Sequence, residues 1–224
     1  MSNPYRLAIF DCDGTLADSQ AAICRAMEDT FLAADLPPPP VAAVRRTIGL
    51  SLVELIRILA PDESDATHRA LVAGYRATFQ RLRESPAFVG EPLFHGAADA
   101  LSALAADGWL LGVATGKSDR GLARVLAHHG IADRFATLQT ADRHPSKPDP
   151  AMILAALAET GVAPHMAAMI GDTSFDMAMA RAAGVRAVGV AWGYHSPTEL
   201  ADAGADVIAE HASELPVLLA RVLG

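Results

Sequence analysis

The chain has 224 residues, of which 51% are hydrophobic and 20% charged, and it carries a formal net charge of -8 at pH 7. This composition provides enough apolar material for one large domain, or one domain plus a small second one, and argues against a disordered chain. The acidic balance, without a Lys/Arg cluster interleaved with aromatic residues, argues against a nucleic-acid partner. No apolar run is long enough to cross a membrane, and the N-terminus shows no secretory leader. Two cysteines without C-x-x-C spacing fit a reducing compartment, so we expect a soluble, cytoplasmic protein.

The first expected element is a short buried strand at residues 5–10, YRLAIF. Similar apolar runs predict strands at 110–115, 135–140, 166–171, 185–192 and 205–209. Helical segments that end at a glycine separate them, at 97–107, 118–129, 150–160 and 174–183, and the sequence SPTE at 196–199 predicts a further helix start. This alternation of strands and helices predicts an α/β fold with a doubly wound, Rossmann-like parallel sheet and helices on both faces.

Residues 17–89 interrupt the alternation, because they contain helical patterns at 18–35, 41–48, 51–60 and 64–84 and no strand run. An all-helical block placed after the first strand is typical of a second domain. We therefore expect an α/β core domain formed by residues 1–16 and 90–224, and a small helical cap domain at 17–89. The connections near 15–18 and 85–92 are the expected hinges.

Polar residues gather where the predicted strands end. The sequence DCDGT follows the first strand at 11–15, TGK ends the second at 115–117, SKPDP lies at 146–150, and GDTSFD occupies 171–176. Ligands of doubly wound sheets bind beyond the carboxyl ends of the strands. We therefore expect all four clusters to meet in one crevice.

Asp11 and Asp13 should point to the same side, because successive residues of extended backbone alternate sides. Two neighbouring carboxylates are tolerated when a cation lies between them, and Asp172 would add a third carboxylate. Oxygen ligands of this kind suit Mg²⁺, which binds few protein carboxylates and commonly a substrate phosphate as well. The residues therefore predict a magnesium site that accepts a phosphate group, although Asp172 is also well placed to cap the following helix.

A carboxylate in such a site can act as a nucleophile toward phosphorus and form an aspartyl phosphate. Lys147 and the magnesium ion would offset the negative charge of the substrate, and the Thr115 hydroxyl could hold phosphate oxygens. Asp13 is placed to donate a proton to the leaving oxygen and later to deprotonate the attacking water. Gly14 would allow the backbone to pass close to the site.

These four motifs, in this order, resemble those of the haloacid dehalogenase-like superfamily, in its phosphoglycolate phosphatase-like branch. The resemblance spans nearly the whole chain and includes the helical insertion, which looks like the mobile cap of that family. It implies Asp11 as the nucleophile and Asp13 as the general acid and base. It also implies Mg²⁺ held by the Asp11 side chain, the Asp13 backbone carbonyl and Asp172. Asp176 would orient Lys147 or a metal-bound water, and the first strand would be central, between the strands that carry Thr115 and Asp172.

The function expected from these residues is a Mg²⁺-dependent phosphatase for a small phosphorylated metabolite, with 2-phosphoglycolate as one candidate. A phosphomutase, a pyrophosphatase or a nucleotidase of the same superfamily stays open, as does a non-catalytic binding module. A dehalogenase or a phosphonate hydrolase is disfavoured, because each lacks acids that this chain retains. We expect a monomer or a homodimer.

Four further residues are candidates for substrate contact: Gly116, Lys117, Arg45 and Gly49. Lys117 could touch the phosphate or simply be solvated. Arg45 and Gly49 lie in the predicted cap, where an ordinary turn between helices with solvated arginines explains them equally well. Cys12 should face the core and be inert.

Overall fold

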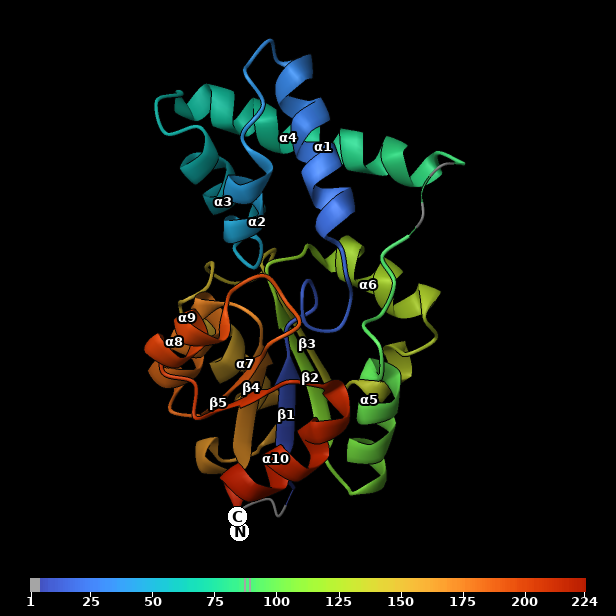
Figure 1. The fold of residues 1–224 in the computed structure, drawn as a ribbon, viewed down its shortest axis with the longest axis vertical. Helices are drawn as coiled ribbons and strands as arrows, with labels where there is room; N and C mark the ends of the chain where they lie inside the picture. Colours follow the sequence, from blue (N-terminus) through green and yellow to red (C-terminus); the bar gives the residue numbers. More distant parts are fainter. Residues whose placement is uncertain (1–4, 87, 89) are drawn as a thin grey trace.

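Six strands form one parallel sheet in the order β3-β2-β1-β4-β5-β6 (Figure 1). The structure is a computed structural model and describes residues 5–86, 88 and 90–224. The strands are β1 (Leu7–Phe10), β2 (Leu110–Thr115), β3 (Thr137–Thr140), β4 (Ala167–Gly171), β5 (Arg186–Val190) and β6 (Val207–Ala209). The predicted doubly wound α/β class is confirmed, and β1 lies between β2 and β4, as predicted.

The strand register brings the predicted motifs to one edge of the sheet. Phe10, the last residue of β1, pairs with Val113 of β2 and with Ile170 of β4. The segments that follow these three strands therefore leave the sheet at nearly the same level. The motifs at 11–15, 115–117 and 171–176 come together for this reason.

Helices cover both faces of the sheet, and alternate residues of β1 face different helices. Ala8 and Phe10 pack in a core cluster with α5 (Ala97–Ala106), α6 (Asp119–His128) and α10 (Leu215–Leu223). Leu7 and Ile9 pack on the other face with α7 (Ala151–Thr160), α8 (Ser174–Ala183) and α9 (Pro197–Asp202). Both faces of the sheet are therefore dry, as expected for parallel strands. Three short 3₁₀ turns complete the core: Ala132–Arg134, Pro164–Met166 and Ala212–Glu214.

The sequence between β1 and α5 contains four helices: α1 (Gln20–Ala33), α2 (Val41–Thr47), α3 (Leu52–Leu59) and α4 (Asp65–Glu84). We call them the cap helices. They have their own apolar cluster, in which the i, i+4, i+8 stripe Ile23, Met27 and Phe31 is buried. Figure 1 shows them beyond the carboxyl ends of the strands, at the top of the molecule. The domain boundaries at 16/17 and 89/90 stay predictions, and residues 87 and 89 of the second expected hinge lie outside the described residues.

Across the described part of the chain, no helix combines the length and the apolar character that crossing a membrane requires.

Candidate active site

Asp11 directly follows β1 and is completely buried. Its Oδ1 accepts a hydrogen bond from the Cys12 backbone N–H at 2.6 Å and lies 3.0 Å from the Lys147 ammonium. Its Oδ2 is buried and has no hydrogen-bond partner among the described residues. A buried oxygen left unpaired is costly unless something else takes it up. This oxygen is therefore available to a cation or to a reacting atom.

Lys147 is buried between two carboxylates. Its Nζ lies 2.6 Å from Asp176 Oδ1, in addition to its contact with Asp11. Although burial lowers the pKa of Lys147, the charges of Asp11 and Asp176 raise it more, so the side chain is an ammonium. A positive charge is thus fixed beside the Asp11 carboxylate.

Asp176 is held in place by the start of α8. Its Oδ2 accepts hydrogen bonds from the Thr173 backbone N–H at 3.0 Å and from the Thr173 hydroxyl at 2.7 Å, within a capping box. Thr173, rather than Asp172, is therefore the residue that caps this helix. Asp176 therefore contacts Lys147 and Thr173 at once; its role in orienting Lys147 stays a prediction.

Asp172 is also completely buried, and tight backbone packing surrounds it. Its Oδ1 accepts a hydrogen bond from the Thr15 hydroxyl at 2.8 Å, and its Oδ2 accepts one from the Tyr194 backbone N–H at 2.9 Å. A Cβ added at Gly14, where φ is +92°, would lie 2.2 Å from Asp172 Oδ2, and one added at Gly193 would lie 2.1 Å from Asp172 Cβ. Glycine is required at both positions because the backbone approaches this carboxylate so closely.

Oxygens of Asp11, Asp172 and Asp176 all lie within 4.8 Å of one another. Burial, reinforced by the neighbouring carboxylates, raises the pKa of Asp11 to about 7 although Lys147 opposes it. Burial together with Asp176 and Asp11 raises the pKa of Asp172 well above its ordinary value. Three buried carboxylates around one ammonium form a site short of positive charge. The unpaired oxygen of Asp11 and the hard oxygen donors fit a divalent cation such as Mg²⁺.

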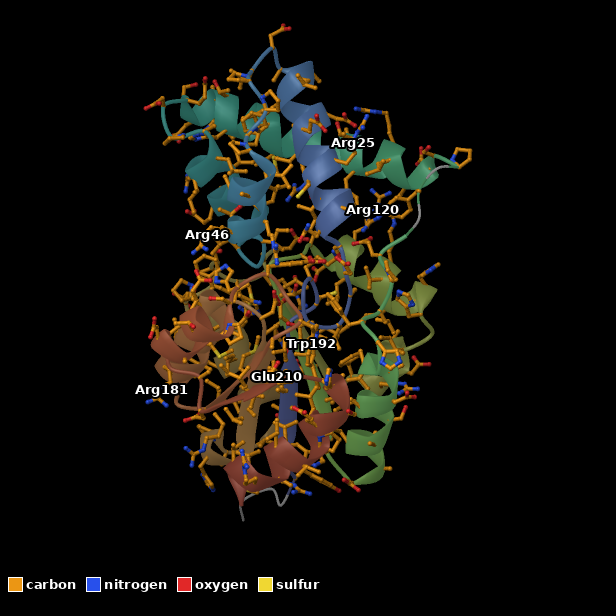
Figure 2. All side chains as sticks on the ribbon, in the orientation of Figure 1. Arg25, Arg46, Arg120, Arg181, Trp192 and Glu210 are labelled. Carbon is orange, nitrogen blue, oxygen red and sulfur yellow. The ribbon has the colours of Figure 1, made fainter. Side chains whose placement is uncertain are left out.

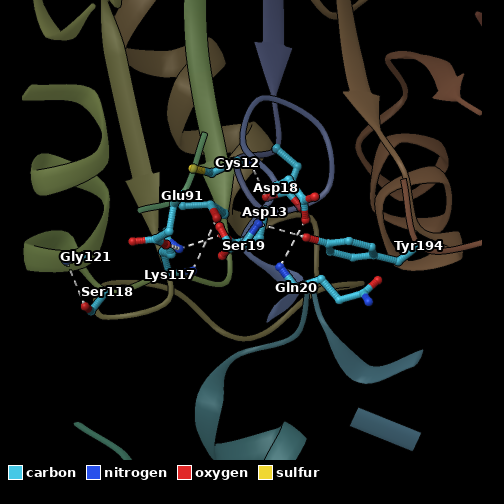
Figure 3. Close-up of polar contacts among 12 residues, drawn as sticks. Cys12, Asp13, Asp18, Ser19, Gln20, Glu91, Lys117, Ser118, Gly121 and Tyr194 are labelled. Atoms are coloured by element: carbon cyan, nitrogen blue, oxygen red, sulfur yellow. Dashed lines mark hydrogen bonds and ion pairs between the residues drawn. The ribbon is translucent and has the colours of Figure 1, made fainter. Parts of the chain in front are cut away.

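Asp13 lies on a different ion-pair chain, shown in Figure 3. Its Oδ1 is 2.5 Å from Lys117 Nζ, which also lies 2.8 Å from Glu91 Oε1. The Lys117 side chain is only 9% exposed. It is therefore paired with carboxylates rather than solvated.

Glu91 was not predicted to be a site residue. It stands in the stretch FVGEPLF at 88–94, where it is a single charge among apolar and turn residues. This isolated charge is the only sequence feature that could have marked Glu91 as a site residue, since its partners lie elsewhere along the chain. The structure buries its carboxylate and pairs it with Lys117 and with Arg83 of α4.

A cavity of about 370 Å³ separates the cap helices from the core. Of the predicted site residues, Asp13, Gly49, Gly116 and Lys117 line it. Thr115 is buried just below, and its Oγ1 accepts a hydrogen bond from the Lys117 backbone N–H at 3.3 Å. Arg45 does not line the cavity.

The loop after α2 rests directly on the core. A Cβ added at Gly116 would lie 2.3 Å from the Leu50 carbonyl oxygen. The Ser51 backbone N–H donates to Ser146 Oγ at 2.8 Å, and Arg45 donates to the Gly193 carbonyl at 3.3 Å. This loop therefore closes one side of the cavity and brings the cap next to Thr115 and Lys117.

The protein is thus of the α/β class, with a doubly wound sheet, a helical insertion after the first strand, and buried carboxylates beside a lysine at the strand ends. The haloacid dehalogenase-like hydrolase family model matches residues 8–190, and the chain belongs to this family. The predicted family and enzyme class, a phosphatase-type hydrolase, are thereby confirmed.

Individual relatives agree with this assignment. The protein named Probable phosphatase IndB of Dickeya dadantii is 36% identical over 93% of this chain and 91% of its own length. A phosphoglycolate phosphatase of Rhodospirillum rubrum is 34% identical over 84% of this chain and 80% of its own. The crystal structure of a hydrolase from Pseudomonas syringae superposes with a TM-score of 0.85 at 26% identity, covering 97% of this chain and 99% of that one.

Proposed function

We propose that this protein is a Mg²⁺-dependent phosphatase that hydrolyses a small-molecule phosphate monoester through a phosphoryl group on Asp11. The observation that carries the proposal is the unpaired, buried Oδ2 of Asp11, whose other oxygen, Oδ1, lies 3.0 Å from the Lys147 ammonium. A nucleophile needs a free electron pair, and Oδ2 has no competing donor among the described residues. A carboxylate that served only structure would be expected to have both oxygens paired.

In the first step, an Asp11 carboxylate oxygen bonds to phosphorus, and the bond from phosphorus to the alcohol oxygen breaks. Asp13 gives its proton to that leaving oxygen. In the second step, the Asp13 carboxylate takes a proton from a water molecule, whose oxygen attacks phosphorus. The bond to Asp11 then breaks and releases inorganic phosphate. Lys147 and Thr115 stabilise the phosphoryl oxygens throughout.

The metal ion would be held by the side chains of Asp11 and Asp172 and by the backbone carbonyl of Asp13. When bound, it supplies positive charge that offsets repulsion between the phosphate and the carboxylates. The closely packed glycines Gly14 and Gly193 fix Asp172, so the chain itself orients this ligand.

The cavity supports an anionic leaving group. Five cationic side chains line it, against the carboxylates of Asp13 and Asp142. The cations are Arg76, Arg83, Lys117, Arg120 and Arg124. Arg120 lies near the junction of the cap and the core (Figure 2). Glu91 pairs with Arg83 and Lys117 from outside the cavity, so Arg120 and Arg124 are the main source of unbalanced positive charge. In a protein with a net charge of -8, this positive charge favours an ester whose alcohol carries a carboxylate or a second phosphate. The compound 2-phosphoglycolate, named in the Rhodospirillum relative, meets this requirement.

The proposed cellular compartment and partners follow from the thiols and from the proposed substrate. We propose a cytoplasmic enzyme, since Cys12 and Cys24 are free thiols and a phosphorylated metabolite is a cytoplasmic substrate. The proposed partner is that metabolite alone, with no nucleic acid or membrane. Monomer and homodimer are equally compatible with this chemistry.

The test is phosphate release from a panel of esters, with Mg²⁺ and again with EDTA. The panel includes 2-phosphoglycolate, a sugar phosphate, a nucleotide and pyrophosphate, so that it separates the phosphatase from a nucleotidase or pyrophosphatase. Isomerisation of the sugar phosphate without phosphate release would indicate a phosphomutase. Turnover that survives EDTA, or an Asp11→Ala variant that retains the wild-type rate, would refute the proposal. A phosphoryl label recovered on the peptide containing Asp11 after rapid quenching would support it directly.

A further inference from the structure

An ion-pair chain connects the last turn of a cap helix with the proposed acid–base residue. Arg83 of α4 donates to Glu91 Oε2 from Nη2 at 2.6 Å and from Nε at 3.2 Å. Glu91 Oε1 accepts from Lys117 Nζ at 2.8 Å, and the same Nζ donates to Asp13 Oδ1 at 2.5 Å. Figure 3 shows Glu91 and Lys117 beside Asp13. Among the described residues, Lys117 is the only side chain bonded to the Asp13 carboxylate, and Glu91 holds that lysine from its other side.

This chain is shielded from solvent. The side chains of Glu91, Lys117 and Asp13 are 6%, 9% and 10% exposed. Salt screens buried pairs far less than exposed ones, and a buried charge without a partner is costly. Although burial raises the pKa of Glu91, the charges of Lys117 and Arg83 lower it to about 2. Glu91 is thus an anion under any working condition of the enzyme.

The backbone of Glu91 is anchored as well. Its carbonyl oxygen lies 2.8 Å from Nε2 of His129, the residue that follows α6. The main chain of Glu91 is therefore fixed to the core and its carboxylate to Arg83 of α4, while Lys117 has a flexible four-carbon stem. Without Glu91, Asp13 would be the only carboxylate holding the Lys117 ammonium, and the pair could move together.

The position of this pair matters because only one oxygen of Asp13 is engaged. Lys117 takes Oδ1, and no described residue forms a hydrogen bond with Oδ2. Asp13 lines the cavity, so Oδ2 is the oxygen available to a leaving group. A change in the Asp13 side-chain rotamer that moved the whole carboxyl group with Lys117 would withdraw this oxygen from the substrate.

We propose that Glu91 is a positioning residue for proton transfer at Asp13, which it serves by holding Lys117 from the side away from the substrate. The inference rests on the proposed function, because Asp13 needs a defined orientation only if it donates a proton to the leaving oxygen. Glu91 touches neither substrate nor phosphorus in this account and acts through Lys117.

The leaving group provides a readout that a purely structural role would not change. An alkoxide leaves poorly unless it is protonated, whereas p-nitrophenolate leaves without a proton. Loss of the proper Asp13 orientation therefore lowers kcat/KM for an alkyl phosphate more than for p-nitrophenyl phosphate. This parameter reports only the steps up to the first transfer of the phosphoryl group. Damage to the fold, the metal site or the nucleophile would lower both values alike.

The experiment compares Glu91→Gln with wild type on p-nitrophenyl phosphate and on the alkyl ester that wild type hydrolyses fastest. Since general acid catalysis contributes about 100-fold or more, we expect kcat/KM for the alkyl ester to fall about tenfold further than for the aryl ester. The matched control is Glu84→Gln, at the exposed end of α4, which should leave both values within about twofold of wild type. Glu91→Asp keeps the charge but withdraws it by one methylene, so an intermediate ratio is expected.

The outcomes separate the two proposals. An equal loss on both esters, in Glu91→Gln or in Glu91→Asp, overturns the role of Glu91 and leaves the proposed function standing. If wild type hydrolyses neither ester, the proposed function fails, and the role of Glu91 fails with it. Should Glu91→Gln unfold, as judged by circular dichroism, Glu91→Asp provides the decisive ratio.

Discussion

Replacing Asp11 by asparagine should stabilise the metal-free protein while abolishing its turnover. Asp11 is completely buried, and burial raises its pKa from 3.8 to about 7. The asparagine side chain keeps an oxygen for the Cys12 N–H and Lys147, and it puts an NH₂ group where Oδ2 now has no partner. That NH₂ group would face the neighbouring carboxylates of Asp172 and Asp176, which are acceptors.

The expected size follows from the pKa. Each unit corresponds to about 1.4 kcal/mol, so a rise from 3.8 to about 7 sets an upper limit of about 4 kcal/mol on the cost of ionising Asp11 in the folded state. The folded pKa of this acid is raised, so the native state is favoured at low pH. The penalty begins at the unfolded pKa of 3.8, grows until the folded pKa near 7, and stays constant above it. The asparagine variant lacks this penalty.

Urea denaturation in EDTA at about pH 5 and about pH 8 measures the difference. We expect the advantage of Asp11→Asn in unfolding free energy to be roughly 1–1.5 kcal/mol at the lower pH, about two fifths of its full size, and to reach roughly 2–4 kcal/mol at the higher pH. For a chain of this size, this corresponds to a melting temperature higher by about 4–16 °C. The control is Asp62→Asn, at an exposed loop position. A variant that is no more stable than wild type at pH 8, or whose advantage does not grow with pH, would refute the electrostatic reasoning.

The remaining predictions concern the metal, the acid, the lysine and the cap contact. Excess Mg²⁺ should raise the unfolding free energy of wild type by about 3 kcal/mol at 100 times its Kd. In a thermal melt, Asp172→Asn should lose most of this gain, and an equal gain in both proteins contradicts the assignment of Asp172 as a metal ligand. Asp13→Asn should lower kcat/KM for an alkyl ester at least about 100-fold with an unchanged circular dichroism spectrum, and a loss below tenfold would contradict its role. Lys147→Met leaves two buried carboxylates without their cation, so urea denaturation at pH 8 should show a loss of about 3–5 kcal/mol; a loss under 1 kcal/mol would be inconsistent with the pairing. Gly116→Ala forces the loop at Leu50 away, because the new Cβ would lie 2.3 Å from the Leu50 carbonyl oxygen. The melting temperature should fall by an amount equivalent to about 1–3 kcal/mol, and an unchanged melting temperature would show that the loop moves without cost.

The sheet and the strand-end clusters could be predicted from sequence because their signals are local. Each strand is an apolar run that ends in turn residues, and parallel strands place their carboxyl ends at one edge. The register of β1 against its two neighbours then brings Asp11, Thr115 and Asp172 together without further information. The helix Leu215–Leu223 was not predicted: it follows directly on the 3₁₀ turn Ala212–Glu214, and only Pro216 in its first turn marks its start.

Glu91 and the cavity could not be predicted, for a different physical reason. Glu91 is paired with Lys117, 26 positions away, and with Arg83, 8 positions away across the connection to the cap. No periodicity links these residues. Likewise, Arg76 of α4 and Arg120 of α6 line the same cavity only because the cap folds back over the core. Long-range ion pairs depend on the tertiary fold, and one sequence alone does not reveal them.

The proposed binding of phosphate would need more positive charge than the two lysines supply. Lys147 lies between two buried carboxylates at 3.0 and 2.6 Å, so it is a permanent part of the site and its charge is already balanced by the protein. It cannot by itself offset a dianionic phosphate that arrives beside three carboxylates. In the proposed mechanism, a second, exchangeable cation held by the carboxylates of Asp11 and Asp172 would offset this charge. On the far side of Asp13, Glu91 balances Lys117 in the same way. The protein therefore neutralises each lysine internally. Of the cavity arginines, Arg83 is paired with Glu91 and Arg76 lies 3.7 Å from Asp142. In the proposed function, Arg120 and Arg124 would attract the negative charge of the leaving group.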